Sequence, residues 1–121
     1  MEKTKKNIPE KPKEEQEIPP PLPLFTPNEL LKVPLRFNIM FLLFNYSQMG
    51  FTELKKLLKC TPGNLDHHLK KLILAGWIED RITFSPRPLK ILRITPKGQE
   101  KFSFQIQQLK KIIRNNKESI D

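Results

Sequence analysis

Residues 51–82 constrain the fold more than any other stretch, because two short helical segments are joined there by a tight turn and followed at once by a strand. The first segment should end near Lys59, and the turn should be Cys60–Gly63. Thr61 is suited to cap the second helix, and Pro62 is suited to its first position, where a missing N–H costs nothing. The lengths, the spacing and the turn residues together predict a helix-turn-helix.

The second helix has two faces of different chemistry. Its large apolar residues follow the spacing of one buried face: Leu65, Leu69, Leu72 and Ile73. At about 100° per residue, a set of small, polar and basic residues lies roughly opposite: Gly63, Asn64, His67, Lys70 and Lys71. A helix with an apolar back and a small, polar, basic front suits the major groove of DNA.

A β-hairpin, or wing, is expected directly after this helix. Gly76 suits a left-handed helix end, and Trp77–Ile82 and Leu89–Thr95 have the character of strands. The proline-rich loop Thr83–Pro88 joins them. The loop and the strands present four cations: Arg81, Arg87, Lys90 and Arg93.

The sequence also predicts helices before the helix-turn-helix and after the wing. Thr26 is a plausible N-cap for a short helical segment that precedes the first main helix. Thr52 is a plausible N-cap for the first helix of the helix-turn-helix. Between them, Leu35–Tyr46 is apolar on most sides, so it should be covered on more than one side, by the domain core and by a partner subunit. Ser47–Gly50 is expected to be a loop.

The last helix should begin after Thr95, as its N-cap, and run to about Asn115. Its apolar residues recur at spacings of four, three and four, as in a coiled-coil seam: Phe102, Ile106, Leu109 and Ile113. Two heptads are too few for an autonomous coiled coil, so the seam should pack on something already folded. No internal repeat is present.

Charge divides the chain into two parts. Residues 1–24 hold five lysines, five glutamates and six of the twelve prolines, so they carry no net charge and too little apolar surface to fold. They are predicted to be a disordered tail, with docking of the proline run on a partner as the alternative. Residues 25–121 should form one domain and carry the whole +9, with 17 basic and 8 acidic side chains, which suits phosphate.

Several functional classes find no support in the residues. The single cysteine excludes an internal disulfide, and two histidines with one cysteine are too few for a typical structural zinc site. There is no phosphate-cradling glycine loop and no catalytic constellation, so we expect a protein that is not an enzyme and needs no cofactor or metal. No signal peptide or membrane-spanning run is seen, so the expected location is cytoplasmic.

The order of expected elements resembles the winged-helix transcription regulators of the MarR and ArsR type. The resemblance covers about Leu35 to Gln105 and is most specific in TPGNLDHHLKKLILAGWIE and in LRITPKGQEKF after the wing. It implies a mainly α fold with a small β-hairpin, dimeric through the first and last helices. The cysteine and histidine clusters with which many ArsR members sense metals are absent from this sequence, which argues against metal control.

The resemblance also implies residue roles. The helix of about residues 62–75 would enter the major groove, and the wing of about 82–90 would meet the minor groove or the backbone. The implied groove residues are Gly63, Asn64, Asp66, His67 and Lys70, with Thr61, His68 and Lys71 on phosphates and Arg87 on the minor groove or backbone. Arg81 and Lys90 on the wing complete the expected DNA contacts. The expected dimer contacts are Phe37, Phe41, Phe44, Phe102, Ile106, Leu109 and Ile113.

Two of these side chains have a second interpretation. Asp66 either accepts a hydrogen bond from a cytosine amino group or pairs with Lys70 at i+4, and the ion pair is favoured. His68 is either a phosphate contact or a satisfied histidine at the edge of the buried face. The side chain of Leu74 is also expected to point outward, and contact with the wing is the one explanation that we have for it.

Together these features favour a homodimeric regulator that binds double-stranded DNA with sequence specificity, as a repressor. Two alternatives remain open: a winged helix that mediates protein–protein contacts in a larger assembly, and a winged helix that binds RNA. A small-molecule effector is compatible with the resemblance, but no residue identifies it.

Overall fold

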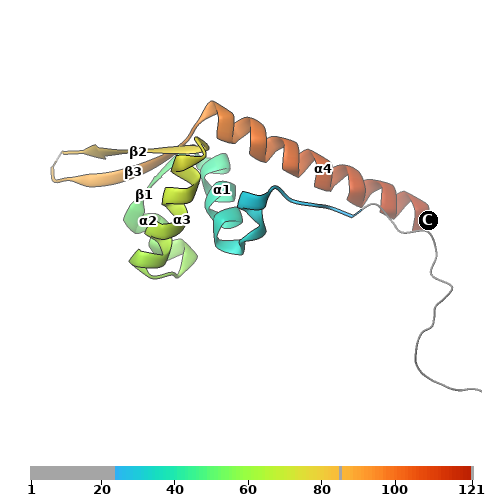
Figure 1. The fold of residues 1–121 in the computed structure, drawn as a ribbon, viewed down its shortest axis with the longest axis horizontal. Coiled ribbons are helices and arrows are strands. Elements are labelled where there is room, and N and C mark those ends of the chain that lie inside the picture. The colour runs from blue at the N-terminus through green and yellow to red at the C-terminus, as the bar shows by residue number, and fades with distance from the viewer. Residues whose placement is uncertain (1–23, 85, 121) are drawn as a thin grey trace, which may run out of the picture.

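The computed structural model describes residues 24–84 and 86–120, with side chains described as far as Asn115. The tail predicted for residues 1–24 lies, except for Leu24, outside the described residues. The elements in chain order are η1 (Glu29–Lys32), α1 (Pro34–Tyr46), β1 (Gln48–Gly50), α2 (Phe51–Leu58), α3 (Pro62–Leu74), β2 (Ile78–Thr83), β3 (Leu89–Ile94) and α4 (Pro96–Ile120). Figure 1 shows α1, α2 and α3 gathered at one end of the long α4, with the hairpin of β2 and β3 extending away from the helices.

The sheet has three antiparallel strands in the order β1-β3-β2. The two hairpin strands fall within one residue of their expected bounds, but the prediction of a loop at Ser47–Gly50 was wrong. Met49 lies opposite Leu92, so β1 adds a third strand along the edge of β3. A three-residue strand has no alternating pattern to reveal it, because its pairing with β3 depends on residues more than 40 positions away.

The helices enclose the core together with the inner face of the sheet. The largest fully buried side chains are Ile39, Met40, Leu43, Leu54, Leu65, Leu69, Leu72, Ile78, Leu92 and Phe102. The ring of Phe102 on α4 lies between two rings of α1, with centroids 5.3 Å from Phe37 and 5.2 Å from Phe44. Tilted aromatic packing of this kind fixes the start of α4 against α1.

Two of the expected helix caps were wrong. The N-cap of η1 is Asn28 and not Thr26, and its side-chain oxygen accepts a hydrogen bond from Leu30 N at 3.0 Å. Helix α2 begins at Phe51, so its N-cap is Gly50 and not Thr52; Glu53 Oε1 accepts from Gly50 N at 3.2 Å. In each case, a nearby polar side chain satisfies the free N–H better than the expected threonine.

The caps of the other two helices agree with the prediction. Thr61 Oγ1 accepts from Asn64 N at 3.2 Å at the start of α3, and Gly76 adopts the expected left-handed conformation, with φ 81°, after it. Thr95 Oγ1 accepts from Gly98 N at 3.0 Å at the start of α4.

The junction between the sheet and α4 is unusually close. The Thr95 hydroxyl lies 2.6 Å from the carbonyl oxygen of Gly76, and Thr95 N donates to the carbonyl oxygen of Trp77 at 3.0 Å. Gly98 is buried so closely against the same Trp77 carbonyl that a Cβ there would meet the oxygen at 2.0 Å. Only glycine lets α4 pass this backbone, so the direction of α4 is coupled to the end of α3. Helix α4 continues to Ile120, about one turn beyond the expected end.

Candidate nucleic-acid interface

The two faces of α3 are separated as the sequence pattern predicts. Leu65, Leu69 and Leu72 have no exposed surface, and Ile73 is partly buried. The opposite face is exposed and comprises Gly63, Asn64, His67, Lys70 and Lys71, with Thr61 just before it, and it ends in Leu74, which points outward as expected and is 91% exposed. The burial of the leucine stripe therefore holds a polar, basic helical face toward solvent.

Asp66 links α3 to the hairpin. Its carboxylate lies 3.1 Å from Lys70 Nζ within α3 and 3.5 Å from Lys90 Nζ on β3, and Lys90 Nζ is also 3.9 Å from Asp80 on β2. The hydrogen bond from Lys70 is the main cause that holds the pKa of Asp66 below its usual range. The ion pair favoured for Asp66 is therefore present, and it extends to a second lysine on the wing.

His68 lies at the boundary of the buried face and contacts a buried arginine. Arg36 on α1 is 9% exposed; its Nε donates to the carbonyl oxygen of Leu30 at 2.7 Å, and its Nη1 lies 3.2 Å from His68 Nδ1. Partial burial, followed by the charge of Arg36, lowers the pKa of His68. A neutral imidazole accepting from Arg36 fits this geometry. This arrangement corresponds to the second interpretation of His68, that of a boundary histidine.

Arg36 has a structural role that the sequence patterns did not reveal. The signal was present, since Arg36 is the one charged residue in the mostly apolar segment Leu35–Tyr46. A charge at such a position needs polar partners, and Arg36 finds them on η1 and α3.

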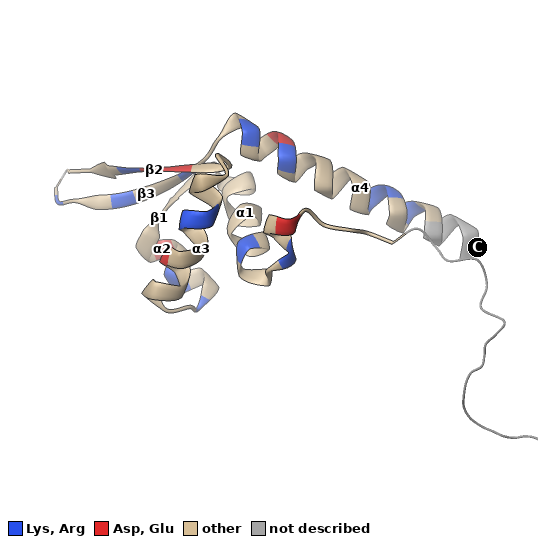
Figure 2. Cartoon of the chain, in the orientation of Figure 1, with Lys and Arg blue, Asp and Glu red and all other residues tan. Residues whose placement is uncertain are grey.

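The expected wing residues occupy different sides of the hairpin. Ile82 lies opposite Lys90 and Arg81 lies opposite Ile91, so Lys90 and Arg81 lie on different faces of the two-stranded ribbon. Arg87 is exposed in the loop between the strands. Figure 2 shows cations on α3 and along the hairpin. The wing also carries exposed apolar side chains, to which the sequence patterns gave no role: Ile82, Phe84 and Leu89.

The residues expected at the dimer interface differ in how deeply they are buried within one chain. Phe102 is fully buried within a single chain, so it supports α1 and is not itself available to a partner. Phe37, Ile106 and Leu109 are partly buried, whereas Phe41, Phe44 and Ile113 are exposed. The seam of α4 thus begins in the core of the domain and becomes exposed toward the C-terminal end of the helix.

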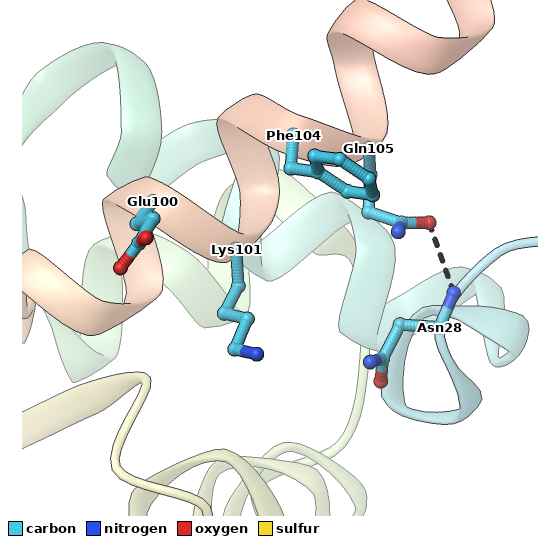
Figure 3. Close-up of a pocket in the computed structure, with 5 residues that line it drawn as sticks. All are labelled: Asn28, Glu100, Lys101, Phe104 and Gln105. Carbon is cyan, nitrogen blue, oxygen red and sulfur yellow. Dashed lines mark hydrogen bonds between the residues drawn. The ribbon is translucent and has the colours of Figure 1, made fainter.

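A shallow hollow of about 320 Å³ lies between α4 and the segment before η1 (Figure 3). It is lined by Asn28, Glu100, Lys101, Phe104 and Gln105, and Gln105 Oε1 accepts from Asn28 N at 2.9 Å at its edge. Phe104 is 58% exposed. A small molecule here would stay largely in water, unlike ligands in well-formed pockets.

Metal-binding clusters and membrane-spanning helices are both absent from residues 24–84 and 86–120. No group of three histidine, cysteine, aspartate or glutamate residues is placed there to hold a metal ion. No helix in this part of the chain is both long and apolar enough to cross a membrane.

Comparison with known proteins gives consistent matches. A family model described as a winged helix DNA-binding domain matches residues 35–113. An uncharacterised protein of Methanocaldococcus jannaschii is 35% identical over 82 residues, covering 67% of this chain and 89% of that protein.

Solved structures agree with this assignment. A transcriptional regulator homologue from Pyrococcus horikoshii OT3 has a TM-score of 0.67 and 31% identity, covering 71% of this chain and 86% of that one. A mutant MarR from E. coli complexed with operator DNA has a TM-score of 0.55 and 22% identity, covering 59% and 51%, so the likeness to it concerns the fold. The chain belongs to the family of winged helix DNA-binding domains, in which α3 is the second helix of the helix-turn-helix and the β2–β3 hairpin is the wing.

Proposed function

We propose that this protein is a sequence-specific transcriptional regulator that binds duplex DNA as a homodimer and acts as a repressor. The observation that carries the proposal is the exposed face of α3, which is mostly polar and basic while the leucine stripe on the opposite face is fully buried. An α-helix fits the major groove of B-DNA, which is about 12 Å wide. The E. coli MarR neighbour was solved with operator DNA, which supports the same use of the fold.

Different residues of α3 would read bases and hold phosphates. His67 and Lys70 are exposed on this face and would meet base edges, while the backbone at Gly63 and Asn64 would allow a close approach. Lys71 and Thr61 flank this face and would contact phosphates, as would Arg87 and Arg81 from the wing.

The residues engaged by internal contacts have a supporting role in this proposal. Asp66 and Lys90 hold α3 and the wing at a set distance, and His68 holds α3 against Arg36. Phosphate would compete with Asp66 for Lys90, so a lysine that positions the wing in the free protein still contributes positive charge near the duplex.

The dimer in this proposal uses α1 and the distal part of α4. Figure 1 shows the C-terminal half of α4 running beyond α1, and Ile113 is exposed on that part of the helix. Phe41 and Phe44 add exposed rings on α1. Two-fold pairing of this surface would present two α3 helices to successive major grooves of one operator. Occupancy of the operator would then exclude other proteins from the same DNA, which is the simplest way for such a dimer to repress.

A salt titration of duplex binding tests the proposal. Duplexes enriched by the wild type from a randomised library, and scrambled versions of them, are titrated by fluorescence anisotropy. If a dimer neutralises about 6–10 phosphates, affinity should fall steeply as salt rises. Lys71→Ala should weaken binding to all duplexes equally and reduce the salt slope by about one unit for each phosphate that the variant no longer neutralises. His67→Ala should instead reduce discrimination, by about 1–3 kcal/mol if it meets a base edge.

Glu100→Gln on α4 provides a control, because it changes the net charge away from α3 and should leave discrimination intact. A wild type with a dissociation constant weaker than about 100 μM at low salt would bind more weakly than ordinary non-specific DNA-binding proteins, and the proposal would then be wrong. The major groove of an A-form RNA duplex is too deep and narrow to admit α3. Equal affinity for such a duplex would therefore show that binding does not depend on α3 entering a major groove, and it would favour the RNA alternative.

A further inference from the structure

The end of the wing is apolar and exposed. Phe84 is 73% exposed and Ile82 is 56% exposed, and Leu89 across the hairpin is also exposed. Large apolar side chains occur singly on most protein surfaces, but three within one short hairpin end need an explanation. Figure 1 shows why they stay uncovered, since the hairpin extends well beyond the helices that could shield it.

The strand register places part of this apolar surface on the side of α3. Residues directly opposite one another in an antiparallel pair share a face, and Ile82 lies opposite Lys90. Lys90 Nζ lies 3.5 Å from Asp66 of α3, so the face of the hairpin that carries Ile82 and Lys90 is the face on the side of α3. Phe84 follows two residues later, at the point where β2 has ended. Ile82 therefore adjoins the side of the wing that faces α3, whereas Leu89 lies opposite Thr83 and so on the other face of the hairpin.

The charge of this segment indicates the kind of surface that it would meet. From residue 81 to residue 90 the sequence holds three cations, Arg81, Arg87 and Lys90, and no carboxylate. An apolar tip surrounded by cations does not suit an ordinary protein surface of mixed charge. It suits a polyanion with an apolar interior, which is what the minor groove offers between its phosphate walls and its stacked bases.

We propose that Phe84 is an apolar wedge that enters the minor groove and partly unstacks one base step, with Ile82 behind it and Arg87 on the adjacent backbone. The inference rests on the proposed DNA binding and adds to it a specificity-determining residue. Wedges of this kind kink a duplex by about 20–90° toward the major groove. Pyrimidine–purine steps unstack most easily, so the wedge would make such a step part of the preferred site without any hydrogen bond to it.

The test uses the full-length chain and a duplex enriched by the wild type from a randomised library, labelled at both ends for energy transfer. The wild type should shorten the end-to-end distance on binding. Phe84→Ala should abolish the shortening and weaken binding about tenfold, as expected when one aromatic side chain no longer stacks on a base. Phe84→Leu should keep part of the bend, since leucine is also an apolar wedge. Arg87→Ala should reduce the salt slope and keep most of the bend.

Phe104→Ala is the matched control, because Phe104 is a similarly exposed ring on α4. It should leave the bend and the affinity unchanged. Phe84→Ala should also keep the thermal midpoint of the wild type, which separates loss of the wedge from loss of the fold.

Three results would overturn the inference. The first is a wild-type complex that binds tightly without bending the duplex, and the second is an equal bend with Phe84→Ala; both leave the proposed function standing. The third is a library from which the wild type enriches no duplex, which overturns the proposed function and the wedge together.

Discussion

The carboxylate of Asp66 on α3 and the ammonium group of Lys90 on β3 lie 3.5 Å apart and link α3 to the wing. The two residues are 24 positions apart in the sequence and belong to different elements. The same carboxylate pairs with Lys70 at 3.1 Å, so one acidic residue restrains two cations, one on α3 and one on the wing.

Asp66→Asn should therefore raise affinity for scrambled duplexes and reduce discrimination. The substitution removes a negative charge that repels phosphate and frees Lys70 and Lys90, so the salt slope should become steeper by about one unit for each further phosphate that these lysines neutralise. Anisotropy titrations on enriched and scrambled duplexes measure both effects. Glu100→Gln makes the same charge change on α4 and should raise non-specific affinity much less. Unchanged discrimination in Asp66→Asn would show that Asp66 does not position the wing.

Stability should decrease in mild acid because of His68. Burial lowers the pKa of His68 in the folded protein, so the neutral form is favoured there. The unfolded state, with a pKa near 6.5, binds the proton more readily, so stability is full above about pH 6.5 and is lost as the pH falls toward the folded-state pKa. Urea unfolding at a series of pH values measures this. His68→Gln should remove this component of the pH dependence, whereas His67→Gln should retain it. Identical slopes for the wild type and His68→Gln would contradict the prediction.

Gly98→Ala should strongly destabilise the domain. The added methyl group would lie 2.0 Å from the carbonyl oxygen of Trp77, a backbone atom that cannot move aside without disturbing the sheet. Overpacking of this kind costs about 1–3 kcal/mol or more, which thermal or urea unfolding would detect. Gly63→Ala is the control, because nothing lies within 4 Å of a Cβ there; its stability should be unchanged or raised by up to about 1 kcal/mol. Equal stabilities for the two variants would exclude close packing at Gly98.

The proposed dimer depends on the exposed part of the α4 seam. Replacing Leu109 and Ile113 together with Glu should convert a dimer into a monomer in sedimentation experiments, because carboxylates would be buried without partners at the interface. Phe104→Glu serves as the control, since Phe104 lies about 200° around the helix from Phe102 and off the seam. It should remain dimeric. A wild type that sediments as a folded monomer at micromolar concentration would refute the interface.

Local patterns predicted most of the elements and the division of α3 into two faces. Thr61 and Thr95 act as caps, Gly76 adopts a left-handed conformation, and the leucine stripe of α3 is buried, because each depends on residues within one or two helical turns. The ion pair between Asp66 and Lys70 belongs to the same class, since its partners are one turn apart.

Contacts between segments that are distant in the sequence could not be predicted from local patterns. Strand β1 forms because β3 offers it a free edge, and Arg36 can stay buried because η1 and α3 bring the Leu30 carbonyl and His68 to it. The close passage of Gly98 over Trp77 follows from the direction of α4, which no local pattern encodes.

The amino-acid sequence alone determined where the helices and the wing strands lie and which face of α3 remains polar, because capping and periodicity act over a few neighbouring residues. Only the tertiary structure decided that Phe102 is a core residue, that Asp66 restrains Lys90, and that the apolar end of the wing remains uncovered. These outcomes depend on which surfaces meet when the elements pack, and packing is a property of the whole fold.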